Sequence, residues 1–257
     1  MTNSEPEDIW RAWLQRWDAQ QSGYLPDREE RFAVMLDVLT ELLPESFTAV
    51  DLACGPGALS ERLLARFPAA QCIALDYDPV LLSIGQGALG EQGGRLRWVE
   101  ADLAAPDWPT RLGTSALDAV LSTTALHWLS AEALEQVYRQ LGALIRPGGV
   151  FLNGDNIAFP LAMEAMGRAA KMLQTQQKAR TPAVAQAETW EQWWAAIDRE
   201  PALATQMAER KRRYPESSHG DHLPDIETHE LLLRSAGFRE VSVIWQLGTN
   251  RVLMAVR

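Results

Sequence analysis

Two acidic residues and two glycines are spaced as the binding site of a nucleoside would need them. Asp51 lies inside the apolar run 49–52, and Gly55 and Gly57 follow in a tight turn. Asp76 ends the next apolar run. A carboxylate at the end of a second parallel strand accepts hydrogen bonds from both hydroxyls of a ribose, and glycines let the backbone pass close to a ligand. The pattern therefore predicts a ribose-containing cofactor without naming it.

A strand, a turn and a helix must hold these residues in place. The run 49–52 is typical of a buried parallel strand, and strong helix formers fill 58–66 directly after the turn. Strand, glycine turn and helix make up the first unit of a nucleotide-binding α/β sheet. We expect further strands at 71–76, at 95–99, at 117–122 and from residue 150 onward.

The residues around this turn resemble the first motif of class I S-adenosylmethionine-dependent methyltransferases. That motif is an acid followed by small residues at alternate positions, here Asp51, Ala53, Gly55 and Gly57. Ala53 departs from the pattern, which has glycine at this position, and adds one methyl group near the cofactor. The rival is the dinucleotide fingerprint Gly-x-Gly-x-x-Gly, which needs a glycine where this chain has Ser60.

The resemblance implies S-adenosylmethionine as the cofactor and a set of residues that bind it. Asp76 would accept from the ribose, and Tyr77 would lie against the adenine or the ribose. Asp102 would accept from the adenine amine, with Leu103 packed on the ring, and Ser122 ends the strand that faces the methyl group. The predicted set is Asp51, Ala53, Cys54, Gly55, Gly57, Asp76, Tyr77, Asp102, Leu103 and Ser122.

The segment Leu126-His127-Trp128 resembles small-molecule methyltransferases of the trans-aconitate methyltransferase type. In that group the segment closes over the cofactor and borders the substrate, so His127 and Trp128 become candidate substrate-binding residues. Histidine titrates near neutral pH, so His127 is also the candidate catalytic base, or else a structural residue at a helix start. Trp194 shares a helix face with two other tryptophans. That face is either the core of an insert or one wall of an aromatic substrate pocket.

The fold class that follows is α/β. We expect a Rossmann-like, doubly wound, seven-stranded sheet with an antiparallel C-terminal hairpin and a helical cap insert. The chain would divide into N-terminal helices that form a lid (1–45), a cofactor-binding core (46–156), the cap insert (157–224), and a last helix and hairpin that complete the core (225–257).

Composition restricts the partners. The 257 residues carry a formal net charge of −10, which disfavours nucleic acid as a substrate. The basic run 210–213 is interpreted as a solvated helix end. Cys54 and Cys72 predict buried thiols in a reducing compartment rather than a disulfide. The sequence shows neither an apolar signal segment nor a long apolar run, so we expect a cytoplasmic protein without a membrane partner.

One loop carries metal-ligating residue types. His219 and His222 lie three residues apart with Asp221 between them, but the sequence offers no identifiable third ligand that would converge on them. We therefore expect no metal.

These features together predict methyl transfer from S-adenosylmethionine to an oxygen, nitrogen or carbon atom of a small molecule. The acceptor stays open between a carboxylate, which the trans-aconitate resemblance suggests, and an aromatic or natural-product-like compound. The protein is expected to be a monomer or a homodimer. The alternatives are a nicotinamide-dependent oxidoreductase and a non-catalytic protein that binds S-adenosylmethionine.

Overall fold

The carboxyl ends of five parallel strands meet along one edge of a seven-stranded sheet in the order β3-β2-β1-β4-β5-β7-β6. The structure is a computed structural model that describes residues 6–25, 27–114, 116–181, 187–214 and 224–257. The strands are β1 (Thr48–Leu52), β2 (Gln71–Asp76), β3 (Leu96–Glu100), β4 (Leu117–Thr123), β5 (Ile145–Asn156), β6 (Glu240–Leu247) and β7 (Asn250–Val256).

Strand β7 points in the opposite direction to the other strands of this sheet, because it pairs antiparallel with both β5 and β6. This arrangement confirms the predicted C-terminal hairpin. The chain leaves β1 toward β2 on one side and later returns to place β4 on the other side, so the strand order reverses between β1 and β4. In open α/β sheets, ligands bind at the carboxyl edge beside such a reversal.

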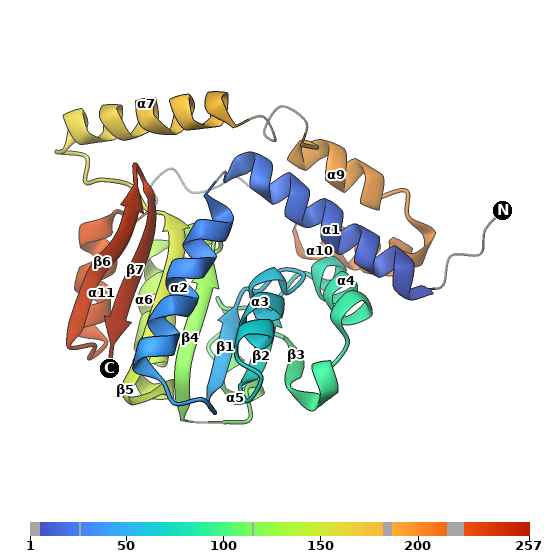
Figure 1. Ribbon diagram of the computed structural model, residues 1–257, viewed down its shortest axis with the longest axis horizontal. Helices are drawn as coiled ribbons and strands as arrows, with labels where there is room; N and C mark the ends of the chain where they lie inside the picture. Colours follow the sequence, from blue (N-terminus) through green and yellow to red (C-terminus); the bar gives the residue numbers. More distant parts are fainter. Residues whose placement is uncertain (1–5, 26, 115, 182–186, 215–223) are drawn as a thin grey trace.

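Helices cover both faces of the sheet (Figure 1). One face carries α2 (Arg28–Leu42), α3 (Ala58–Arg66) and α4 (Pro79–Leu89), and the other carries α5 (Trp108–Arg111), α6 (Ala131–Leu144) and α11 (Ile226–Ser235). The remaining helices are α1 (Pro6–Tyr24), α7 (Glu164–Arg180), α9 (Trp190–Ile197) and α10 (Ala204–Arg213). In the described part of the chain, none of the helices is both long and apolar enough to span a membrane.

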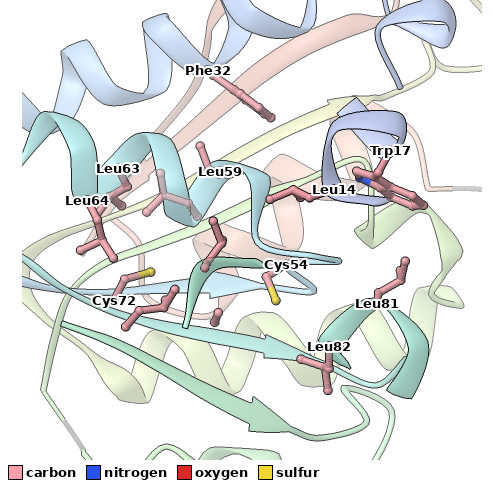
Figure 2. Close-up of a cluster of buried hydrophobic side chains, with 14 of the residues drawn as sticks. Leu14, Trp17, Phe32, Cys54, Leu59, Leu63, Leu64, Cys72, Leu81 and Leu82 are labelled. Atoms are coloured by element: carbon pink, nitrogen blue, oxygen red, sulfur yellow. The ribbon is translucent and has the colours of Figure 1, made fainter. Parts of the chain in front are cut away.

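The apolar core follows from alternation along the strands. In β1, Ala49 packs toward α2 and α3, whereas Val50 packs toward α6. Figure 2 shows the first of these two cores, with Phe32 of α2 and Leu63 of α3 above the sheet. Cys54 and Cys72 are free and buried in this core, which confirms that they are buried thiols. Each Å² of apolar surface that is removed from water stabilises the fold by about 25 cal/mol, so this core is the main source of stability.

The N-terminal helices have different positions. Helix α2 lies on the face of the sheet, and its Phe32, Met35 and Leu39 are fully buried there. Helix α1 instead packs on α4 and α9, and Trp17 lies close to the glycine turn after β1. Only α1 is therefore placed where a lid over the carboxyl edge would be.

The insert between β5 and α11 divides into two parts (Figure 1). Helix α7 packs on the turn of the β6–β7 hairpin, where Gln174 Nε2 donates to Thr249 Oγ1 over 2.5 Å. Helices α9 and α10 lie at the other end of the sheet edge, where α9 packs on α1 and α10 packs on α4. The two parts of the insert therefore contact different parts of the molecule, and its role as a cap remains a prediction.

Candidate active site

The turn after β1 is held in an unusual backbone conformation. Gly55 and Gly57 have φ values of +57° and +82°, and Ala53 has a φ of +56°. An L residue with a side chain pays roughly 1–2 kcal/mol for this left-handed conformation. A Cβ on Gly57 would come within 2.6 Å of the Trp98 ring. Gly57 is therefore required by packing as well as by its backbone angle.

Asp51 is fully buried at the end of β1. Its Oδ2 accepts hydrogen bonds from the backbone N and the Oγ of Ser60, at 3.0 and 2.7 Å. Its Oδ1 has no hydrogen-bond partner among the described residues. Burial raises the pKa of Asp51 to about 6, although the bonds from Ser60 act in the opposite direction. A buried carboxylate oxygen without a partner favours a ligand that brings a donor or a positive charge.

Asp76 ends β2 and draws the glycine turn toward it. Its Oδ2 accepts from the backbone N of Gly55 at 2.7 Å, and its Oδ1 accepts from the backbone N of Tyr77 and of Asp78 at 2.7 and 2.8 Å. Burial raises the pKa of Asp76 to about 6, and the backbone donors limit that rise. Oδ1 is thus saturated, whereas Oδ2 keeps one lone pair for a further donor.

Three of the other predicted cofactor residues already have partners within the fold. Asp102 lies just after β3, and its Oδ1 accepts from the backbone N of Ala104 at 2.9 Å. Leu103 is buried in the core beneath. Ser122 is buried, and its Oγ donates to the Leu52 carbonyl at 2.9 Å, which ties β4 to β1. The hydroxyl proton of Ser122 is therefore already used by the fold.

A histidine–aspartate pair occupies the neighbouring part of the edge. His127 lies in a short 3₁₀ turn after β4, and Asp155 lies near the end of β5. His127 Nδ1 is 2.7 Å from Asp155 Oδ1, and the backbone N of His127 is 3.3 Å from Asp155 Oδ2. Because a carboxylate only accepts, Nδ1 carries a proton in both forms of the ring, and Nε2 presents a lone pair in the neutral form. The His127 side chain is 26% exposed, so Nε2 can meet a ligand.

Asp155 stays an anion although it is 1% exposed. Burial by itself would raise the pKa of Asp155. The hydrogen bond from His127, the charge of this ring when it is protonated, and the charge of Arg31 outweigh burial and lower the pKa of Asp155 below its ordinary value. Arg31 is fully buried on α2 and donates to Asn250 Oδ1 at 3.0 Å and to Thr123 Oγ1 at 2.7 Å. Strands β4, β5 and β7 and helix α2 thus build one polar network around His127.

Backbone strain marks both sides of the reversal in strand order. Ala53 follows β1, and Thr124, which follows β4, has a φ of +51°. A β-branched residue in this conformation is a genuine outlier, and such strain concentrates at functional sites. The two strained residues flank the position where the fold predicts the ligand.

The two predicted substrate-binding tryptophans lie in different surroundings. The Trp128 side chain is 57% exposed, and its ring centre is 5.0 Å from that of His127. Trp194 is buried where α9 meets α1 and α10, and the Arg210 guanidinium lies 3.5 Å from its ring centre. This packing favours the interpretation of the Trp194 face as insert core.

The basic run on α10 corrects one prediction. Lys211 and Arg212 are exposed, as expected for a solvated helix end. Arg210 and Arg213 are instead largely buried, and they contact the loop after β2 and the last residue of β3. The interpretation as a wholly solvated run is therefore wrong for these two residues.

Sequence reasoning missed Asp155 and Arg31. Asp155 follows an apolar run at the end of a strand, which is the signal that identified Asp76, so the same rule could have found it. Arg31 gives no local signal, since its burial depends on Thr123 and Asn250, which lie far away in the sequence.

The metal prediction is not tested by the structure. The His219–His222 loop lies outside the described residues. Across the part of the chain that is described, no group of three or more histidine, cysteine, aspartate or glutamate side chains is arranged to hold a metal ion.

Comparison with known proteins identifies the class. Residues 49–149 match the model of a methyltransferase domain family. The trans-aconitate 2-methyltransferase of Azoarcus sp. strain BH72 is 33% identical over 137 residues, which are 52% of this chain and 48% of that protein. The malonyl-[acyl-carrier protein] O-methyltransferase of Legionella pneumophila is 31% identical over 105 residues, 40% of this chain and 34% of that protein. The chain spans about half the length, or less, of these curated relatives.

Solved structures show the same fold. An O-methyltransferase family protein from Burkholderia thailandensis superimposes with a TM-score of 0.57 at 20% identity, over 94% of this chain and 59% of that one. Human N-acetylserotonin methyltransferase, solved with S-adenosylmethionine, gives a TM-score of 0.50 at 17% identity, over 96% of this chain and 66% of that one. Residues 49–149 therefore match a methyltransferase domain family, and the chain has the fold of solved methyltransferases. The sequence is similar to the trans-aconitate 2-methyltransferases.

Proposed function

We propose that this chain transfers a methyl group from S-adenosylmethionine to a small-molecule acceptor. The cofactor would lie over the carboxyl ends of β1, β2 and β3, and the acceptor would lie beside His127. The match to a methyltransferase domain family supports the reaction. The 2.7 Å contact between His127 Nδ1 and Asp155 Oδ1 is the observation that carries the assignment of the acceptor side.

The hydrogen-bond acceptors at the carboxyl edge of the sheet suit S-adenosylmethionine. Asp51 Oδ1 lacks a partner among the described residues, and Asp76 Oδ2 has a lone pair left. S-adenosylmethionine carries an ammonium group, a sulfonium and two ribose hydroxyls, which are all donors or positive charges. We assign Asp51 and Asp76 to these groups, with Tyr77, Asp102 and Leu103 on the adenine side.

The same contacts disfavour a nicotinamide cofactor. A dinucleotide places its pyrophosphate on the N-terminal N–H groups of the first crossover helix. Here that helix is α3, and the backbone N–H of Ser60 already donates to Asp51 Oδ2 at 3.0 Å. A pyrophosphate could not bind this N–H and would lie near the buried carboxylates of Asp51 and Asp76. Electrostatic repulsion would therefore disfavour its binding.

The chemistry assigns distinct tasks to the residues near His127. The cofactor, when bound, supplies an electrophilic methyl group on sulfur, so the protein has to align the acceptor and exclude water. For a hydroxyl acceptor, Nε2 of His127 would take the proton that the oxygen loses as its bond to the methyl carbon replaces the carbon–sulfur bond of the cofactor. Asp155 accepts from Nδ1 throughout, which holds the tautomer and stabilises the imidazolium.

A carboxylate acceptor is the second candidate, favoured by the similarity to trans-aconitate 2-methyltransferases. A carboxylate oxygen has no proton to lose, so no base is needed. His127 would then bind the acceptor as an imidazolium, with Asp155 as its counter-ion.

The test is transfer of a labelled methyl group from S-adenosylmethionine to two panels of acceptors, hydroxylated aromatics and small polycarboxylates that include trans-aconitate. With a hydroxyl acceptor, His127→Gln lowers kcat by about 100-fold, because general-base catalysis is lost. With a carboxylate acceptor, the same variant mainly raises the KM of the acceptor. Cofactor binding without transfer to either panel would instead favour a non-catalytic S-adenosylmethionine-binding protein.

A further inference from the structure

Helix α10 of the insert contacts the loop that follows β2. Arg210 Nε is 2.6 Å from Asp78 Oδ2. Arg213 Nη1 donates to the Tyr77 carbonyl at 2.6 Å, and Arg213 Nη2 lies 2.6 Å from Glu100 Oε1 at the end of β3. Two arginines of one helix therefore bridge the ends of two adjacent strands.

These contacts connect directly to the carboxylate assigned to the ribose. The backbone N–H groups of Tyr77 and Asp78 both donate to Asp76 Oδ1. The other oxygen of Asp78, Oδ1, caps α4 by accepting from the backbone N of Val80 at 2.9 Å. Helix α10 thus contacts the same two residues whose backbone N–H groups donate to Asp76.

Asp76 is largely covered by its surroundings. Asp76 is 9% exposed, and the turn that donates to it is buried as well. A Cβ on Gly55 would lie 3.7 Å from the ring of Trp17 on α1, so α1 covers the turn from its own side. Helix α10 covers the loop on the β2 side through Arg210 and Arg213.

Several buried polar atoms near α10 lack a hydrogen-bond partner among the described residues. Trp193 Nε1, Trp194 Nε1 and Gln206 Oε1 are buried without a hydrogen-bond partner among the described residues, and so is Gln20 Nε2 on the facing helix α1. Buried polar groups are normally paired, so each unpaired one weakens the docking of α9 and α10. The arginine contacts are therefore the specific polar part of this interface, beside apolar side chains such as Leu203 and Met207 that belong to the core.

We propose that α10 is a clasp on the cofactor site. Arg210 and Arg213 are positioning residues: they hold the loop after β2 in place, and their release admits and frees the cofactor. This proposal rests on the proposed function, because it concerns entry of S-adenosylmethionine.

The chain offers matched variants for a test. Arg210→Gln removes the contact with Asp78 from one side. Asp78→Asn removes the ion pair from the other side, and asparagine remains a good N-cap for α4. Arg212→Gln is the control, because it removes the same charge from the same helix, where the side chain is 76% exposed and pairs with Glu209.

The experiment is stopped-flow binding of S-adenosylmethionine, followed by tryptophan fluorescence, with folding checked by thermal melts. We expect Arg210→Gln and Asp78→Asn each to raise the association rate constant about threefold or more, since the open state becomes more populated. Arg212→Gln leaves it at the wild-type value. An unchanged or lower association rate constant in both test variants overturns the clasp, even if dissociation is faster, because a simple pocket wall would change dissociation alone.

The two levels of failure are distinguishable in this experiment. If the wild-type protein does not bind S-adenosylmethionine, the proposed function falls and the clasp falls with it. If the wild-type protein binds and the test variants associate at the rate of Arg212→Gln, only the clasp is wrong.

Discussion

Asp76 and Asp155 are both buried carboxylates at the same edge of the sheet, yet their pKa values move in opposite directions. Burial raises the pKa of Asp76 to about 6, because its partners are neutral backbone N–H groups. Burial acts on Asp155 too, but the bond and charge of His127 and the charge of Arg31 lower its pKa. The comparison shows that partner charge, not depth, decides the state of a buried carboxylate.

The difference separates two roles along the edge. Asp76 keeps one free lone pair and lacks a cationic neighbour, so it suits one hydroxyl donor of a ribose. Asp155 is committed to His127 and acts on the acceptor only through that imidazole. The cofactor side therefore binds through carboxylates themselves, whereas the acceptor side uses a carboxylate to set the state of a base.

The largest expected effect comes from Asp155→Asn. The asparagine amide would donate to His127 Nδ1, which moves the proton to Nε2 and leaves no lone pair for the acceptor. With a hydroxyl acceptor we expect kcat to fall by about 100-fold, while the affinity for S-adenosylmethionine stays within about twofold. Steady-state methyl transfer and equilibrium binding measure the two quantities. A variant with wild-type kcat would remove Asp155 from the mechanism.

A smaller effect is expected for Asp76→Ala. Loss of the charge-assisted bond that the free lone pair of Asp76 Oδ2 would accept from the ribose weakens S-adenosylmethionine binding by at least about tenfold, on the order of 1.4 kcal/mol. Calorimetric titration measures the affinity, and Asp76→Asn, which keeps an oxygen acceptor, should lie between the alanine variant and wild type. If Asp76→Ala bound as tightly as wild type, the ribose assignment would be wrong.

The smallest effect is a difference in pH dependence. The pKa of Asp76 is about 6 in the folded protein and 3.8 as its ordinary value. The folded state therefore binds the proton first, so this group adds stability as pH falls from 8 to 5, by about 1 kcal/mol, and loses it as pH rises. Asp155 has its pKa below 3.8 in the folded state and contributes no such change in this range.

Urea unfolding at pH 8 and pH 5 tests this contrast. Asp76→Asn should lose about 1 kcal/mol of the pH-dependent stability, and Asp155→Asn should keep it. Other groups titrate nearby, since burial also raises the pKa of Asp51 to about 6 and lowers that of His229 to about 4. The variants are therefore compared with wild type and not with an absolute curve. Equal slopes in both variants would contradict the contrast.

Patterns within short stretches of the sequence predicted the strands and helices of the sheet. The strand 71–76 and the helix 58–66 have the expected bounds, since apolar runs and helix formers there agree with the turn chemistry between them. Asp51, Gly55 and Asp76 lie together as predicted, because consecutive parallel strands bring their ends to one edge. The assignment of these residues to a cofactor remains a prediction.

Features that depend on contacts between distant parts of the chain could not be predicted from the sequence. Arg31 lies on the buried face of α2. From the sequence alone, an arginine at this position predicts an exposed side chain, because arginine is rarely buried without a partner. The division of the insert depends on packing such as that of Trp17 against Trp193, whose ring centres are 5.0 Å apart. The burial of Arg210 depends on Asp78, which lies in a different unit of the sequence.

The most direct test of the account is calorimetric titration of the wild-type protein with S-adenosylmethionine and, in parallel, with NADH. The account predicts micromolar binding of S-adenosylmethionine and none of NADH, because two buried carboxylates accept donors and repel a pyrophosphate. Binding of NADH alone would contradict the assignment of Asp51 and Asp76 and return the chain to the oxidoreductases. Binding of neither ligand would contradict the cofactor site itself.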